Sequence, residues 1–381
     1  MKKMLFFVIF LFLFSANAFP ETSMNETEYL NRQDSQQRPV TIESGLNNSS
    51  EPSKFKINPG SPKRNEFFYP RSELKKNVGI NLPQKDSLWS LKTGTPPYVS
   101  LIRTSPYSVQ ELCGITQVNS DIQNRIGLLT GRLKGRVSDW LSKASYYVPL
   151  MAEILAENGV PAELVYLPLI ESGFDTHAIS SAGAVGQWQF MSFTARRYGL
   201  KIDEWVDERR DPEKATRAAA AYLSDLHSMF GAWTLALSGY NAGEGRVMNA
   251  VSNAGTNNFW SLKQTTHLPK ETRKYVPTFI AAAIIAHEPE RYGLNVYYQN
   301  PMDFDLVMID SPMDMQVVAK LAETDRETVR RLNPELKQGS TPLNVDYYLV
   351  RIPAGRRKIF FKNYVTYSKT ALLSAGSRAA L

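Results

Sequence analysis

The 381-residue sequence has one cysteine and four histidines, and both scarcities exclude kinds of protein. A single thiol, Cys113, forms no intrachain disulfide, so the fold must depend on its hydrophobic core. The histidines show no metal-ligand spacing such as H-x-x-x-H, so we expect no metal site and no cofactor. The sequence also lacks a run of five or six basic residues, which argues against nucleic acid as the partner.

The formal net charge of +7 leaves the kind of partner open. It suits contact with an acidic polymer or with the lipid headgroups of a membrane surface, and it serves solubility equally well. Charge alone therefore allows peripheral contact with a cell wall or membrane and requires neither.

Long apolar runs are scarce too, and the one at the N-terminus is short. Two lysines precede an apolar run over residues 4–14, and Ala16-Asn17-Ala18 offers a small-x-small cleavage site. This pattern predicts a cleavable signal peptide over residues 1–18. A retained anchor is the alternative, although the run is shorter than the roughly 20 residues that a membrane-spanning helix needs. No cysteine lies near Ala18, so we expect no lipoprotein acylation and a mature protein outside the cytoplasm.

Composition and periodicity divide the rest of the chain into four segments. Residues 19–85 are rich in Ser, Asn, Gln, Pro and charge, which predicts a disordered or loosely packed leader. Residues 86–295 follow a helical pattern and form the main domain with an N-terminal helical extension. Residues 296–365 predict a small second module, and residues 366–381 a frayed polar tail from about Ser368.

Helical signals run through the main domain. One buried helix face is indicated by apolar residues at three- and four-residue steps, namely Tyr147, Leu150, Met151, Ile154 and Leu155. A capping acid followed by proline, Asp211-Pro212, begins an Ala-rich helix that should end near Gly231. A last long helix should span residues 271–287. This domain is predicted to be mainly α.

The pattern changes after residue 292. Strands are predicted near residues 304–309 and 347–352, with short helices at 317–321 and 327–332 between them. The resulting β-α-α-β order predicts a compact α+β module.

The chemistry is concentrated between residues 162 and 190. An apolar segment, residues 164–170, delivers Glu171 at its end, and a small-residue loop and Gln187-Trp188-Gln189-Phe190 follow. A carboxylate at the end of an apolar helix is poorly solvated, so its pKa should rise toward the range that a general acid needs. On these features alone, a solvated or capping role is the more usual one for a residue such as Glu171, and Trp188 and Phe190 are more often core residues than a platform for sugar.

Four motifs in order resemble family 1 lytic transglycosylases, whose catalytic domain resembles goose-type lysozyme. Glu171-Ser172-Gly173-Phe174 is followed by S-x-A-G-A-x-G-x-W-Q-F over residues 180–190. D-E-R-R-D-P follows at residues 207–212, Y-N-A-G-E-G at 240–245 and E-T-R-K-Y-V at 271–276. A P-x-E-L run at residues 161–164 resembles the run that precedes the catalytic helix in the membrane-bound murein transglycosylase D subgroup.

The resemblance implies an exported, periplasmic enzyme that acts on the glycan strands of peptidoglycan. Glu171 would protonate the bond between N-acetylmuramic acid and N-acetylglucosamine, and would then take the C6 hydroxyl proton to close a 1,6-anhydro ring. The substrate contacts that it implies are Ser180, Gln189, Met191, Tyr240, Asn241 and Tyr275. For Tyr240 and Tyr275 the alternative is a buried hydroxyl satisfied inside the fold.

The resemblance implies a single catalytic carboxylate, whereas most glycosidases use two. The N-acetyl group of the substrate would then stabilise the charge that develops at C1. Asp175, four residues after Glu171, is interpreted as a helix-end or loop acid. Two departures from the family pattern, Gln187 and Gly239, could alter the binding groove, and the lipid-modified cysteine of the subgroup is absent.

The C-terminal module resembles a degenerate LysM unit, the kind of module that binds N-acetylglucosamine-containing glycan. The resemblance is carried by V-V-A-K-L-A at residues 317–322, Leu332-Asn333-Pro334 and Y-Y-L-V-R-I-P at 347–353. The usual G-D-T-L opening is replaced by residues 311–315, so packing on the catalytic domain is an equal alternative to glycan binding.

A peptidoglycan lytic transglycosylase is therefore the function that we expect. A hydrolytic muramidase, which uses water instead of the C6 hydroxyl, is one alternative, and a non-catalytic peptidoglycan-binding protein of the same fold is the other.

Overall fold

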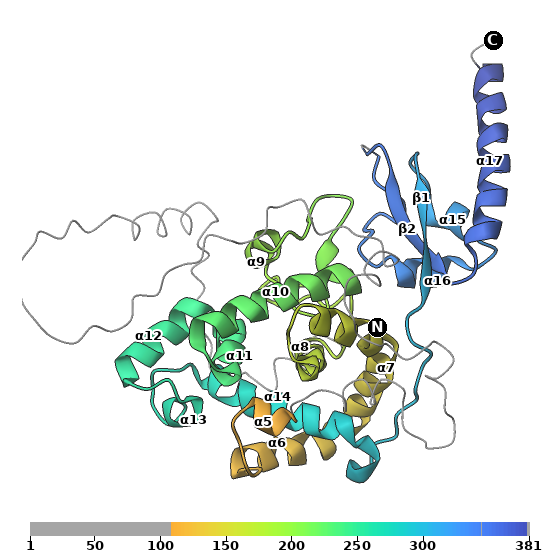
Figure 1. Ribbon diagram of the computed structural model, residues 1–381. Coiled ribbons are helices and arrows are strands. Elements are labelled where there is room, and N and C mark those ends of the chain that lie inside the picture. Colours follow the sequence, from red (N-terminus) through yellow and green to blue (C-terminus); the bar gives the residue numbers. More distant parts are fainter. Residues whose placement is uncertain (1–107, 344, 379–381) are drawn as a thin grey trace, which may run out of the picture. The chain divides into compact units, whose positions relative to one another are not determined.

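The computed structural model describes residues 108–343 and 345–378 (Figure 1). The predicted signal peptide, the leader and the start of the main domain lie outside the described residues, so those boundaries stay predictions. In the part that the structure describes, no helix combines the length and the apolar character needed to cross a bilayer.

From residue 108 to residue 292, helices make up nearly all the regular structure, as the sequence predicted. As far as residue 197 these are α5 (Val109–Leu112), α6 (Ser120–Thr130), α7 (Lys134–Glu157), the 3₁₀ helix η2 (Ala162–Tyr166), α8 (Leu167–Glu171) and α9 (Ser192–Arg197). Beyond it follow η3 (Glu208–Arg210), α10 (Pro212–Phe230), α11 (Trp233–Ala242), α12 (Glu244–Ala254), α13 (Phe259–Leu262), α14 (Lys270–His287) and η4 (Pro289–Tyr292).

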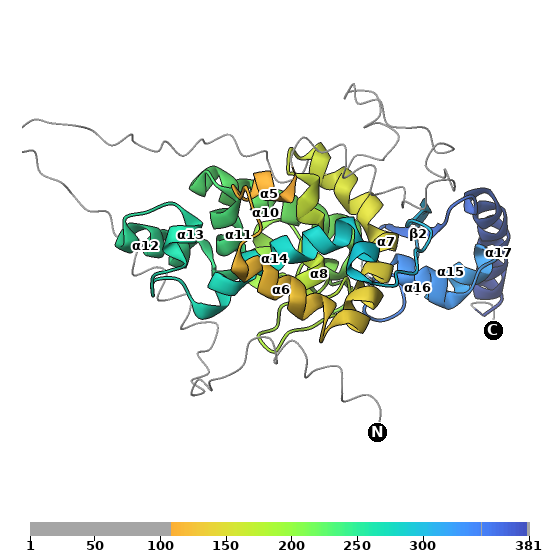
Figure 2. The ribbon, with the colours of Figure 1, turned by 90° about the horizontal axis from the view of Figure 1, so that it is seen from below.

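Helix α14 provides much of the core of the main domain. It packs against α6 and α11 and also touches α8, as the two ribbon views indicate (Figures 1 and 2). Val276, Phe279 and Ile280 on this helix are fully buried. Burying each of these side chains stabilises the fold by about 1.5–3 kcal/mol. Helix α14 is therefore firmly held in the core, and it supports α8, which packs against it.

Helix α10 begins and ends as its sequence signals predicted. The Asp211 side chain accepts hydrogen bonds from the backbone N–H groups of Glu213 (2.9 Å) and Lys214 (3.0 Å), and Pro212 occupies the first turn. Gly231 ends the helix with a left-handed φ of 69°. Two of the free N–H groups of the first turn are thereby satisfied by one carboxylate.

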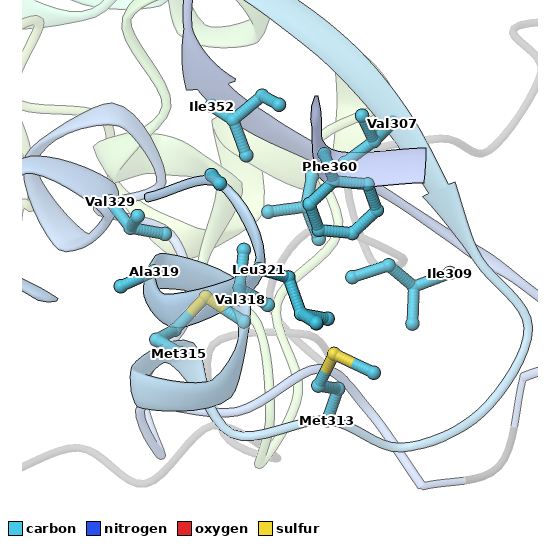
Figure 3. Packing of buried hydrophobic residues seen from close by; sticks show 12 residues of the cluster. Val307, Ile309, Met313, Met315, Val318, Ala319, Leu321, Val329, Ile352 and Phe360 are labelled. Carbon is cyan, nitrogen blue, oxygen red and sulfur yellow. The ribbon is translucent and has the colours of Figure 1, made fainter. Parts of the chain in front are cut away.

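The C-terminal module has the predicted β-α-α-β order. Its elements are β1 (Phe304–Ile309), α15 (Met315–Leu321), α16 (Arg326–Leu332) and β2 (Tyr348–Pro353). The two strands are antiparallel, with Val307 opposite Val350. Residues from both strands and from the helices form a small core of their own (Figure 3).

The tail differs from its prediction. Helix α17 spans Arg357–Arg378, so most of the segment expected to be frayed is helical. The reason lies at its start, where Phe360 is fully buried in the core of the module, as Figure 3 shows, and stacks on Tyr364 with ring centroids 5.6 Å apart. This anchor offsets the cost of helix nucleation, and the following Ala- and Leu-containing sequence favours continuation.

Candidate active site

Glu171 is the last residue of α8, a short helix that rests on α14. The chain then turns sharply, because Gly173 and Phe174 both have left-handed φ angles, of 60° and 61°. A Cβ atom on Gly173 would lie 2.3 Å from the Trp140 ring, so only glycine allows this close approach. The carboxyl group is thus placed at the end of an apolar segment, as the sequence predicted.

Tyr275 of α14 is in direct contact with this carboxyl group. Its hydroxyl donates a hydrogen bond of 2.5 Å to Glu171 Oε1, and its side chain is buried. Among the residues predicted for the site, this one therefore reaches the acid itself. Its role as a substrate contact stays a prediction.

The pKa of Glu171 is raised from its ordinary value to about 7. Burial is the main cause, since it disfavours the charged form, and the negative charge of Glu271 acts in the same direction. The hydrogen bond from Tyr275 opposes both, because it favours the carboxylate. A carboxyl group with this pKa can both release and accept a proton near neutral pH.

The loop of residues 180–190 lies next to this helix end and contains Ser180 and Gln189. Ser180 closes its first turn, because its Oγ accepts from the Ala184 backbone N–H at 3.0 Å. Gln189 has a φ of 50°, which is rare for a residue with a side chain. Its Nε2 donates to the Gly186 carbonyl at 2.8 Å, which holds this conformation. Strain of this kind is common at functional sites.

Trp188 is a core residue, the simpler of the two interpretations. It is fully buried, and its Nε1 donates to Thr216 Oγ1 of α10 at 2.9 Å. The Trp188 carbonyl accepts from the Tyr240 hydroxyl at 2.7 Å. The hydroxyl of Tyr240 is therefore satisfied inside the fold, and this residue braces the loop from α11.

The remaining predicted contacts lie at differing depths. Asn241 is half-buried, and its Oδ1 accepts from Thr272 Oγ1 at 2.9 Å. Met191 precedes α9 and is 46% exposed. Asp175 is a loop acid, as expected, since its Oδ1 accepts from the His177 backbone N–H at 2.8 Å. Glu171 and Tyr275 thus make direct contact, whereas Asn241 and Met191 have no hydrogen bond to Glu171 in the described part of the chain.

Two residues that were not predicted as site residues hold the 180–190 loop in place beside Glu171. Ser172 Oγ donates to the Gln187 carbonyl at 2.9 Å and so joins the helix end of Glu171 to the 180–190 loop. Arg209 is buried, and its Nη1 donates to the carbonyls of Gly183 and Phe190, both at 3.2 Å. Arg209 belongs to the D-E-R-R-D-P motif, so its position was marked by the sequence although its function was not.

The described residues include no cluster of three or more His, Cys, Asp or Glu side chains arranged to hold a metal ion. The chemistry that the arrangement supports directly is proton transfer by one carboxyl group.

Known proteins resemble this chain in both of its parts. Residues 150–263 match the family model described as Transglycosylase SLT domain, and residues 303–369 match that of Lytic transglycosylase MltD, LysM-like domain. These matches confirm the resemblance seen in the motifs, including that of the C-terminal module.

Individual relatives are similar over part of their length. The chain is 37% identical over 216 residues to membrane-bound lytic murein transglycosylase D of Escherichia coli strain K12, which covers 55% of this chain and 47% of that protein. It is 32% identical over 154 residues to peptidoglycan transglycosylase gp16 of Escherichia phage T7, covering 39% of this chain and 11% of that protein. The chain thus spans about half the length of the first relative.

Among solved structures, the 70 kDa soluble lytic transglycosylase of Escherichia coli superposes with a TM-score of 0.36 at 20% identity. The superposition covers 51% of this chain and 32% of that one.

Proposed function

We propose that this chain, which carries a transglycosylase SLT domain at residues 150–263 and a LysM-like domain at residues 303–369, is a lytic transglycosylase that cleaves peptidoglycan glycan strands. Glu171 is its acid and base. The observation that carries the proposal is the position of this carboxyl group, at the end of an apolar helix and in contact with Tyr275, with a pKa of about 7.

The reaction needs one group that gives a proton and then takes one back. Protonated Glu171 gives its proton to the glycosidic oxygen as the bond from C1 of N-acetylmuramic acid breaks, and N-acetylglucosamine leaves. The N-acetyl oxygen of the substrate stabilises the positive charge at C1. The Glu171 carboxylate then removes the C6 hydroxyl proton, O6 bonds to C1, and the acid is restored. No water is consumed.

The other predicted site residues have supporting parts in this scheme. Ser180, Gln189 and Met191 contact the sugars near the cleaved bond from the 180–190 loop and its end. Tyr240 and Asn241 border the acid on α11. Tyr275 orients the Glu171 carboxyl through its hydrogen bond.

We place the enzyme in the periplasm, exported by a cleavable signal peptide over residues 1–18 and not acylated, in contrast to a relative that is named membrane-bound. The glycan strand is the partner, without cofactor or nucleic acid. Peripheral contact with the membrane surface is compatible with the net charge of +7.

Mass spectrometry of the fragments released from purified peptidoglycan tests this function. The mature protein from Phe19 onward should release muropeptides that end in 1,6-anhydro-N-acetylmuramic acid. Glu171→Gln should lower turnover at least about 1,000-fold, because the amide neither gives nor takes the proton. Asp175→Asn is the matched control, since this nearby acid bonds only to the loop backbone in the described structure, and it should retain turnover.

Other outcomes separate the alternatives. Products with ordinary reducing ends would identify a hydrolytic muramidase. Sedimentation with the wall and no products would identify a binding protein. Substantial turnover by Glu171→Gln would remove the assigned role of this residue.

A further inference from the structure

A buried group of charges joins the C-terminal module to the SLT domain. Arg351, on β2, bonds to Asp211 through both guanidinium arms, at 2.8 and 3.0 Å, and to Glu213 at 3.2 Å. Glu335 lies 3.8 Å from the same guanidinium. The side chains of Arg351, Asp211 and Glu335 are only 6%, 0% and 2% exposed.

Charges buried to this degree hold their partners tightly. Removing one member of a buried pair leaves an uncompensated charge in a medium of low dielectric, which is strongly destabilising. The two parts of the chain therefore separate here only at high cost. The junction unites residues 140 positions apart in the sequence.

Backbone hydrogen bonds reinforce the junction. The N–H of Asp207 donates to the Glu335 carbonyl at 2.9 Å, and the N–H of Lys337 donates to the Trp205 carbonyl at 2.9 Å. Between them Val206 and Leu336 form an antiparallel bridge. Residues 335–337 thus pair with residues 205–207 in the manner of a short strand.

One route leads from this junction to the 180–190 loop through Arg209. Asp207 holds the Arg209 guanidinium with two hydrogen bonds, at 2.8 and 2.9 Å. Arg209 in turn donates to the carbonyls of Gly183 and Phe190. Asp207 therefore pairs with the module through its backbone and also orients the Arg209 side chain. Arg209 in turn bonds to two carbonyl groups of the 180–190 loop.

A second route runs through α10. Asp211, which Arg351 holds, caps this helix. Thr216, one and a half turns further on, accepts the indole hydrogen bond of Trp188. The neighbouring Gln187 carbonyl accepts from Ser172, the residue after Glu171. Contacts that begin in the module thus reach Ser172, the residue that directly follows the acid.

We propose that the C-terminal module positions the active site, with Arg351 as a positioning residue that sets the 180–190 loop relative to Glu171. The proposal rests on the proposed function, since it concerns the same acid. The module is in this sense a structural part of the catalytic unit, whether or not it also binds glycan.

Three variants of the full mature chain test the proposal. Arg351→Gln removes the buried charge, and Arg351→Lys keeps a charge but loses the two-armed contact. Arg330→Gln changes an exposed arginine of the same module, whose ion pair with Glu327 is long at 3.9 Å, and is the matched control. Should Arg351→Gln fail to fold, the double variant Arg351→Met with Asp211→Asn removes the opposite charges together.

Turnover, substrate affinity and amide hydrogen exchange are measured on each folded variant. Arg351→Gln should lower kcat at least 10-fold with KM changed less than 3-fold, and exchange in residues 180–190 should quicken. Arg351→Lys should recover part of the kcat, and Arg330→Gln should match the parent. An unchanged kcat and unchanged loop exchange in folded Arg351→Gln, or in the double variant, would overturn the proposal.

The activity of the parent protein shows whether a negative result contradicts the proposed function or only the positioning role of Arg351. A parent without products would contradict the proposed function, while loop exchange still reports on the positioning. An active parent whose Arg351 variants match it in kcat and exchange would contradict the positioning alone.

Discussion

Burial and the hydrogen bond from Tyr275 move the pKa of Glu171 in opposite directions, and a single substitution can remove the hydrogen bond. Burial raises the pKa of the carboxyl, and the tyrosine hydroxyl lowers it by stabilising the carboxylate. The resulting pKa of about 7 suits the two roles, acid and base, that we propose for this residue. The hydrogen bond comes from a different helix, α14, since Tyr275 lies 104 residues further along the chain than Glu171.

Tyr275→Phe should therefore move the pH profile toward higher pH. In the proposed mechanism the first step needs protonated Glu171, so kcat/KM should fall as pH rises through the pKa of this group. Without the Tyr275 hydroxyl the Glu171 carboxylate is less stable, so the pKa of Glu171 rises. The alkaline limb of the kcat/KM profile should then move to higher pH by about one pH unit. The measurement is the pH dependence of kcat/KM on soluble glycan strands.

Tyr240→Phe serves as the comparison for this limb. The Tyr240 hydroxyl donates to the Trp188 carbonyl and not to Glu171. Its loss should leave the alkaline limb in place even where the rate changes. Equal shifts in both variants, or a downward shift in Tyr275→Phe, would contradict the hydrogen-bond account.

At the scale of elements, the 180–190 loop depends on glycines for two separate reasons. Gly183 and Gly186 both have a φ of 83°, which residues with a Cβ rarely adopt. A Cβ on Gly183 would meet nothing within 4 Å, whereas one on Gly186 would lie 1.9 Å from the Arg209 carbonyl oxygen. Substitution of Gly183 therefore tests backbone strain alone, whereas substitution of Gly186 adds a steric clash.

Alanine substitutions at these two positions should differ sharply. Gly183→Ala should cost about 1–2 kcal/mol of unfolding free energy, the penalty for a left-handed residue. Gly186→Ala should cost at least about 3 kcal/mol more and remove most turnover, because the loop must move away from Arg209. Urea denaturation and turnover on peptidoglycan measure both, and similar losses in the two variants would contradict the close approach at Gly186.

At the scale of the molecule, the buried junction makes the SLT domain and the C-terminal module one unit. Separate domains with a small polar interface usually unfold independently, whereas a shared buried interface couples their unfolding. We expect one transition for the two parts in scanning calorimetry. Two transitions, with the module unfolding first, would indicate that the Arg351 contacts do not hold in solution.

The midpoint temperature of this transition should decrease as the pH rises from about 5 to about 7. Burial raises the pKa of Glu171 and of Glu335 to about 7, above their ordinary value of 4.5. The folded protein therefore binds protons in this range that the unfolded chain has released, so stability decreases as pH rises. The Glu171→Gln variant removes one of the two groups and should show a smaller decrease, measured by the same scans.

Much of the fold could be predicted from local signals. The α10 cap at Asp211-Pro212, the span of α14 and the β-α-α-β order of the module all depend on residues a few positions apart. Propensity, capping and periodicity report on such neighbours. The tail was predicted wrongly because the anchor of α17 is Phe360, which is buried in a core that includes residues of β1, far earlier in the sequence.

The sequence by itself determined the order of motifs, the placement of Glu171 at the end of an apolar segment and the resemblance that points to glycan cleavage. Only the tertiary structure decided which residues touch the acid, that Trp188 is core, and that Arg351 reaches Asp211. These contacts join positions 104 and 140 residues apart. Hydrophobic periodicity indicates which face of a helix is buried, but the partner of that face depends on how all the helices pack together.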